Sequence, residues 1–145
     1  MGTGRDDFTK DTIRKAAGRV GYRCSFPNCP NATIGASMES PNKTSVTGVA
    51  AHICAAAEGG PRYDQNMSVD ERRSVENCIW LCQTHSKLID TDVETYTVEK
   101  LHQWKADAEL AASKALADGD YFGEYYKGNG DNLDILKQLF DDMIT

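Results

Sequence analysis

Two pairs of metal-type ligands, Cys24-x4-Cys29 and Cys82-x2-His85, constrain the fold of this 145-residue chain more than any other feature. Three thiolates and one imidazole form a donor set that closes a tetrahedral zinc site and excludes water. Turn-forming residues separate the first two cysteines and bend the chain back on itself. We therefore predict a structural zinc ion on Cys24, Cys29, Cys82 and His85. The alternative is that these cysteines are buried free thiols.

The cysteine count and the N-terminus indicate the compartment. There are five cysteines, an odd number, and the N-terminal stretch MGTGRDDFTK does not resemble a signal peptide. A disulfide framework is therefore disfavoured, and we expect a protein of the reducing cytoplasm. No apolar run approaches the roughly 18 residues of a membrane span, so we expect no membrane association.

The distribution of apolar and capping residues predicts an α+β fold with flanking helices. Thr9 or Asp11 can cap a first helix, Ser68 begins a capping box with Glu71, and Thr97 can cap the longest helix. We expect helices over 8–20, 68–75 and 97–117, and a helix that starts over 86–89 in a segment ending at Asp90. We expect strands over 44–51 and 78–82, a second short strand beginning at His52, and a loop over 36–43.

The C-terminal part of the chain differs in composition from the rest. Residues 1–36 have a net charge of +3, whereas residues 118–145 have a net charge of −5 within a total of −6. We expect one domain over 1–117, a linker over 118–132 and an amphipathic segment over 133–145. An isolated helix of about 12 residues is marginal in water. This segment should therefore pack against something: the nuclease core, a second copy or partner protein, or a sensor domain that follows in a longer parent chain. We favour an intermolecular contact, because the Gly-rich stretch KGNGDN separates the segment from the core.

A histidine and an asparagine mark a second candidate site. His52 lies in the apolar run AAHI, and Asn77 opens the apolar run NCIWLC. A lone histidine in such a run is more often a structural residue than a catalyst, so its neighbours decide its interpretation. Between the two runs, Arg62 lies in a loop and Arg73 on the expected capped helix, and their guanidinium groups suit bidentate contact with phosphate. The alternative for each is an ordinary surface charge.

The combined pattern AHI…GPRY…ERRS…ENCIWLC…H…LID resembles the HNH endonuclease family over about residues 10–115. It is most similar to HNH nuclease domains of bacterial anti-phage effectors. The resemblance implies a ββα-metal core with a zinc knuckle. It also implies that His52 is the general base, because a neutral imidazole can take a proton from water near pH 7. Asn77 would fix the loop that carries this base, and Arg62 and Arg73 would contact phosphate.

Two positions depart from the family pattern. Ala51 occupies a position where many members have an acidic metal ligand, and Ser86 one where many have a histidine ligand. Asp90 lies four residues after Ser86, on the same side of a helix, and a carboxylate suits Mg²⁺ or Mn²⁺. We predict Asp90 and Ser86 as ligands of the catalytic metal. The alternative for Asp90 is a charge on the helix surface.

The expected function is metal-dependent hydrolysis of double-stranded DNA with little sequence specificity, in anti-phage defence. Two alternatives stay open. One is a catalytically weak, zinc-stapled module that binds nucleic acid or protein, which Ala51 and Ser86 favour. The other is a ribonuclease, because nothing in the sequence separates RNA from DNA substrates.

Overall fold

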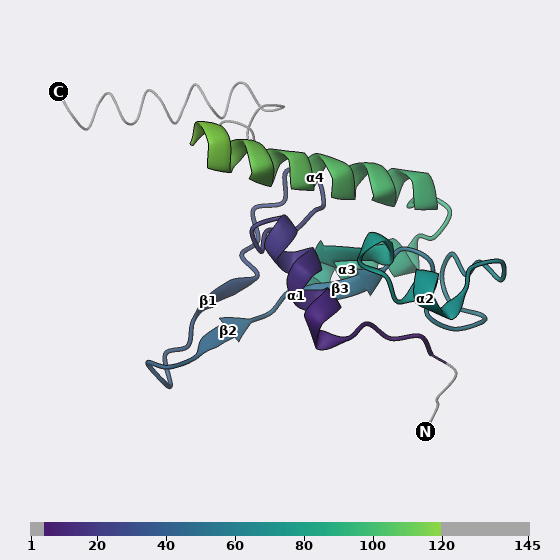
Figure 1. The fold of residues 1–145 in the computed structure, drawn as a ribbon, viewed down its shortest axis with the longest axis horizontal. Coiled ribbons are helices and arrows are strands. Elements are labelled where there is room, and N and C mark those ends of the chain that lie inside the picture. Colours follow the sequence, from purple (N-terminus) through teal and green to yellow (C-terminus); the bar gives the residue numbers. More distant parts are fainter. Residues whose placement is uncertain (1–4, 120–145) are drawn as a thin grey trace.

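The computed structural model describes residues 5–119, whose arrangement is shown in Figure 1. The α+β class is confirmed, with short antiparallel strand pairs flanked by helices. The segment 133–145 and all but the first two residues of the linker 118–132 lie outside the described residues. In chain order the elements are α1 (Lys10–Arg19), β1 (Ile34–Ala36), β2 (Thr44–Val46), β3 (Val49–His52), α2 (Val69–Arg72), the 3-10 helix η1 (Val75–Asn77), β4 (Cys78–Leu81), α3 (Gln83–Thr91) and α4 (Val98–Asp118).

Strands β3 and β4 form the antiparallel pair that carries the candidate catalytic histidine. Val49 pairs with Leu81 at one end, and His52 pairs with Cys78 at the other. All four residues of β4 are buried, because α1, α3 and α4 pack against this strand. A strand covered in this way is apolar at every position and does not alternate, which explains the run CIWL.

The strand expected over residues 44–51 is divided in two. Its first part, β2, pairs with β1, and its second part, β3, pairs with β4. Gly48 lies at the break, where an added Cβ would overlap the indole ring of Trp80. The close approach of backbone to this ring requires glycine there. The prediction of a second strand beginning at His52 was wrong, since His52 is the last residue of β3.

The β1–β2 hairpin projects from the body of the molecule, as Figure 1 shows. All of its strand residues are exposed, so it contributes little to the core. The loop expected over residues 36–43 connects these two strands, and Met38 within it is 94% exposed.

Side-chain caps define the starts of the helices. Thr9 caps α1, Ser68 and Glu71 form the predicted capping box of α2, and Thr97 caps α4. Helix α2 ends at Arg72, earlier than expected, and the chain continues into η1. Helix α4 ends at Asp118, and the capping residue Gly119 has a φ of 68°, the left-handed conformation typical of a helix C-terminus. None of the helices between residues 5 and 119 has the length and apolar character of a membrane span.

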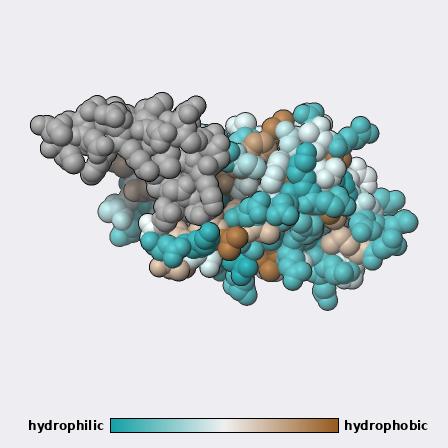
Figure 2. All heavy atoms as spheres, turned by 90° about the horizontal axis from the view of Figure 1, so that it is seen from above, coloured by the Kyte–Doolittle hydropathy of each residue, from teal (hydrophilic) through white to brown (hydrophobic). Residues whose placement is uncertain are grey.

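The hydrophobic core surrounds the three cysteines of the predicted zinc site. Its fully buried side chains come from the β3–β4 pair, the loop after β3, α3 and α4, namely Ile53, Ile79, Leu81, Ile89 and Leu101. Hydrophilic residues cover most of the described surface on the face shown in Figure 2, with hydrophobic residues in small patches. Because this core consists of few side chains, we expect a metal link to contribute to its stability.

Candidate metal centre and adjoining histidine site

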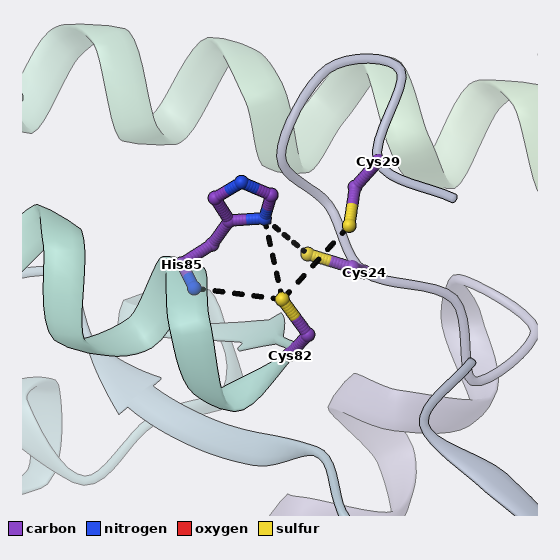
Figure 3. Close-up of side chains that lie close together, drawn as sticks. All are labelled: Cys24, Cys29, Cys82 and His85. Carbon is purple, nitrogen blue, oxygen red and sulfur yellow. Dashed lines mark hydrogen bonds between the residues drawn. The ribbon is translucent and has the colours of Figure 1, made fainter. Parts of the chain in front are cut away.

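The four predicted zinc ligands meet in one cluster, shown in Figure 3. Cys29 Sγ lies 3.9 Å from Cys82 Sγ, and His85 Nδ1 lies 3.6 Å from Cys24 Sγ and 3.3 Å from Cys82 Sγ. A tetrahedron with Zn–S of about 2.3 Å and Zn–N of about 2.0 Å has S···S edges of about 3.8 Å and S···N edges of about 3.5 Å. The cluster therefore has the dimensions and the donor set of a structural zinc site.

Local structure positions these ligands in two groups. Cys24 and Cys29 bracket a tight turn in which Asn28 has a positive φ of 60°. Cys82 is the N-cap of α3, and its Sγ accepts a hydrogen bond from the backbone N–H of His85. The helix therefore begins at Gln83 rather than at Ser86 as expected. One helix N-terminus presents both members of the Cys-x-x-His pair.

Hydrogen bonds around Cys82 favour negative charge on its sulfur atom, whereas burial dominates at Cys24 and Cys29. The side-chain amide of Asn31 donates to Cys82 Sγ, and its backbone N–H donates to Cys29 Sγ, both at 3.4 Å. Burial alone would raise the pKa of the Cys82 thiol, but hydrogen bonds from Asn31, His85 and the neighbouring cysteines lower it below its usual value. Burial raises the pKa of Cys24 to about 12. Because thiolates bind zinc, Asn31 belongs to the centre as a supporting residue.

An aromatic cluster holds the histidine ligand and connects it to α4. The ring of Phe26 stacks on His85 with centroids 3.7 Å apart and planes inclined by 4°. The rings of Trp104 and Tyr96 pack against Phe26, with centroid distances of 4.8 Å and 6.1 Å respectively. These contacts restrict rotation of the imidazole and explain why α4, which supplies no ligand, lies next to the centre.

His52 lies at a separate cavity of about 220 Å³. Asp90 of α3 and Arg5 line the same cavity, together with residues of the turn after β3. The imidazole Nε2 is 3.0 Å from the carbonyl oxygen of Asp6, and the ring stacks on Phe8 with centroids 3.8 Å apart. Burial lowers the pKa of His52 from its ordinary value of 6.5. The ring is therefore neutral near pH 7 and can accept a proton.

Asn77 holds the turn that follows His52. Its side chain is buried at 3% exposure. Oδ1 accepts a hydrogen bond from the backbone N–H of Cys54, and Nδ2 donates to the carbonyls of Cys54 and Arg72, each at 2.9 Å. This is the geometry that the predicted positioning role requires, although the role itself stays a prediction.

The two predicted ligands of the catalytic metal differ in their surroundings. Asp90 lines the cavity with a side chain that is 45% exposed. Ser86, one turn earlier on α3, is half-buried and is not among the residues that line this cavity. Within residues 5–119, the only group of three or more histidine, cysteine or acidic side chains placed to bind a metal is the zinc cluster. A divalent ion at Asp90 would therefore depend largely on substrate phosphate and water, which is common for Mg²⁺.

The arginines predicted to contact phosphate are placed differently from each other. Arg62 has a side chain that is only 4% exposed, and it donates to the carbonyls of Ile53 and Ile89 and to Asp90 Oδ1 at 2.7–2.8 Å. This burial argues against direct phosphate contact. We assign Arg62 instead to holding the turn after β3 against α3. Arg73 is exposed and donates to the carbonyl oxygen of Asp7.

We expect Arg62→Gln to lower the free energy of unfolding by about 2–4 kcal/mol, because charge-assisted hydrogen bonds are lost and buried carbonyls are left without a donor. Urea denaturation at fixed zinc concentration measures this change. The matched control is Arg73→Gln, which removes an exposed guanidinium and should change stability by no more than about 0.5 kcal/mol. Equal stability of the two variants would contradict the assignment of Arg62.

The sequence pattern did not single out residues 5–8, which adjoin His52. Arg72 forms an ion pair with Asp6 at 3.2 Å, and the backbone N–H of Asp6 donates to Ala56 O at 2.9 Å. These contacts join parts of the chain that are far apart in sequence, so no local motif predicts them.

Comparison with models of known protein families finds none that matches this chain, and comparison with curated proteins finds no significant match.

Proposed function

We propose that this chain is a metal-dependent HNH-type endonuclease that cleaves double-stranded DNA with little sequence specificity. The observation that carries this proposal is that His52 and Asp90 line one cavity. The side chain of Asn77 holds the turn that directly follows His52 through Cys54. The ββα arrangement implied by the resemblance is supported by the order β3, β4 and α3 and by the antiparallel pairing of the two strands.

His52 acts as the general base in this proposal. Its half-buried, neutral ring takes a proton from a water molecule, and the resulting hydroxide attacks phosphorus. Asn77 supports this step indirectly by fixing the backbone at Cys54, two residues after the base. A Mg²⁺ or Mn²⁺ ion at Asp90 would neutralise charge on the scissile phosphate and stabilise the leaving oxygen.

Other side chains define how substrate is held. Arg73 is exposed at the C-cap of α2, and it is our candidate for contact with the DNA backbone. Contacts to phosphate position a duplex without reading its sequence, which is why we propose low specificity. A role in anti-phage defence rests on the resemblance of the sequence alone and forms part of the proposal.

A second candidate function is a zinc-stapled module that binds nucleic acid without cutting it. The observation that favours it is that the cavity has only two acidic side chains, Asp90 and Glu58, while Ala51 and Ser86 stand in place of the usual metal ligands. A ribonuclease that uses the same site is the third candidate function.

Incubation with supercoiled plasmid, and with RNA of matched sequence, separates these functions. The zinc-loaded protein should nick and then linearise plasmid in Mg²⁺ or Mn²⁺, and EDTA added at the start should prevent this. Faster loss of RNA than of DNA would assign a ribonuclease. A mobility shift of DNA without any cleavage would assign the binding module.

Asp90→Asn should reduce Mg²⁺-supported cleavage on the order of 10²-fold, because it removes the carboxylate charge that would bind the ion. Zinc content should stay unchanged, because no zinc ligand is altered. The control is Asp92→Asn, which changes an exposed carboxylate at the end of α3 that does not line the cavity. Equal Mg²⁺ dependence in both variants would indicate that Asp90 is only a surface charge paired with Arg62.

A further inference from the structure

Residues 5–8, which we term the N-terminal strap, are fixed against the His52 site at several points. The backbone N–H of Asp6 donates to Ala56 O at 2.9 Å, and the Asp6 carboxylate pairs with the buried Arg72. Arg73 donates to the carbonyl oxygen of Asp7 at 3.1 Å. The strap is therefore bound both to the turn after β3 and to the end of α2.

The strap makes two contacts with the imidazole of His52. The carbonyl oxygen of Asp6 lies 3.0 Å from Nε2. A carbonyl can only accept a hydrogen bond, so Nε2 must carry the proton, and the neutral ring then has its lone pair on Nδ1. Phe8 stacks on the ring with an interplanar angle of 10°, which opposes its rotation.

We propose that the N-terminal strap is a positioning part of the catalytic site, in which Asp6 and Phe8 hold His52 with Nε2 protonated and Nδ1 available as the base. This inference rests on the proposed nuclease function and adds to it the atom that accepts the proton. Asp6 contributes through its backbone, and Phe8 through its ring. Neither needs to touch substrate.

The physical reason is that an unrestrained imidazole divides its population between two tautomers and several ring orientations. A partner on one nitrogen selects the tautomer and the orientation. Loss of such a partner from a metal-binding histidine typically costs about 10–100-fold in activity, and we expect a loss of similar size for His52. In His52 this partner comes from a residue 46 positions earlier in the sequence. The strap therefore completes a site that β3, η1 and α3 only partly build.

The first test reads the tautomer directly and does not depend on cleavage. The chain has three histidines, so long-range ¹H–¹⁵N spectra of the zinc-loaded protein are simple, and His52→Gln identifies the His52 signals. We expect His52 Nε2 to be protonated and Nδ1 to be unprotonated at neutral pH. A protonated Nδ1, or an even mixture of the two forms, would overturn the inference.

The second test separates positioning from stability. Phe8→Ala should lower kcat for plasmid cleavage by about 10–100-fold with KM changed less than about twofold, and Phe8→Tyr should restore kcat, because it keeps the stacked ring. The control is Leu110→Ala, which truncates an exposed apolar side chain on α4. Zinc content and melting temperature, measured on every variant, identify any general loss of fold.

Failure of the inference differs from failure of the proposed function. Cleavage that requires His52 but is unchanged in Phe8→Ala would overturn the strap's role and leave the nuclease intact. A folded, zinc-loaded wild-type protein that cleaves nothing would overturn the nuclease, and the strap's catalytic role with it, whatever tautomer the spectra show.

Discussion

Removal of zinc is expected to unfold this domain or to lower its melting temperature sharply. The ligands join the Cys24–Cys29 turn to the start of α3, and the three cysteines lie within the main hydrophobic core. Structural zinc sites in small peptides contribute about 10–16 kcal/mol of apparent binding free energy at neutral pH, comparable with the entire stability of a typical domain. Circular dichroism during heating, with and without a zinc chelator, measures the effect.

Elemental analysis should accompany this experiment and find one zinc ion per chain. Cys82→Ala, which removes one ligand, should reproduce the effect of the chelator. Cys54→Ala is the matched control, because Cys54 is also buried but lies outside the cluster. This control should keep its zinc and lose far less stability. Purified, untagged wild-type protein that is folded and contains no zinc would refute the assignment of the centre.

Substitution of His52 by alanine is expected to reduce DNA cleavage by about 10²–10⁴-fold, the usual contribution of a general base. DNA binding should stay near the wild-type value, because the change removes no charge at neutral pH. His102→Ala is the control, since His102 is exposed on α4 and does not line the cavity. Equal cleavage rates in the two variants would exclude His52 as the base.

The pH dependence of cleavage gives an independent check on His52. Burial lowers the pKa of its imidazole below the ordinary 6.5. The base is active when neutral, and it is neutral above its pKa, so activity should persist at pH 6.5 and fall only at lower pH. A rate that already declines on acidification from pH 8 to pH 7 would contradict this shift.

Local sequence signals were sufficient to predict the zinc centre. The spacing of Cys24 and Cys29, with turn residues between them, and the Cys-x-x-His pair at the start of a helix both encode ligand geometry within a few residues. The capping box at Ser68 was predictable for the same reason. Asn31 and Phe26, which support the centre, have no comparable signal, because their contacts depend on how the turn folds over α3.

The surroundings of His52 were much less predictable. Arg62 follows Gly60 and Pro61 in a loop, where an arginine is usually exposed, and the family resemblance implied a phosphate contact, yet its guanidinium binds buried carbonyls. The contact between His52 and Asp6 spans 46 residues and uses a backbone carbonyl. Because every residue has such a carbonyl, the type of residue at position 6 does not indicate the contact. The division of the expected strand at Gly48 likewise depends on the packing of Trp80.

The most direct measurement is a single-turnover assay of plasmid nicking by the purified, zinc-loaded chain in excess over DNA. Protein incubated with DNA alone should leave the plasmid supercoiled, and addition of Mg²⁺ or Mn²⁺ should start nicking at a rate that His52→Ala reduces at least about 10²-fold. Protein that binds the plasmid but leaves it supercoiled at every metal concentration would contradict a nuclease. So would metal-dependent nicking that proceeds equally fast without His52.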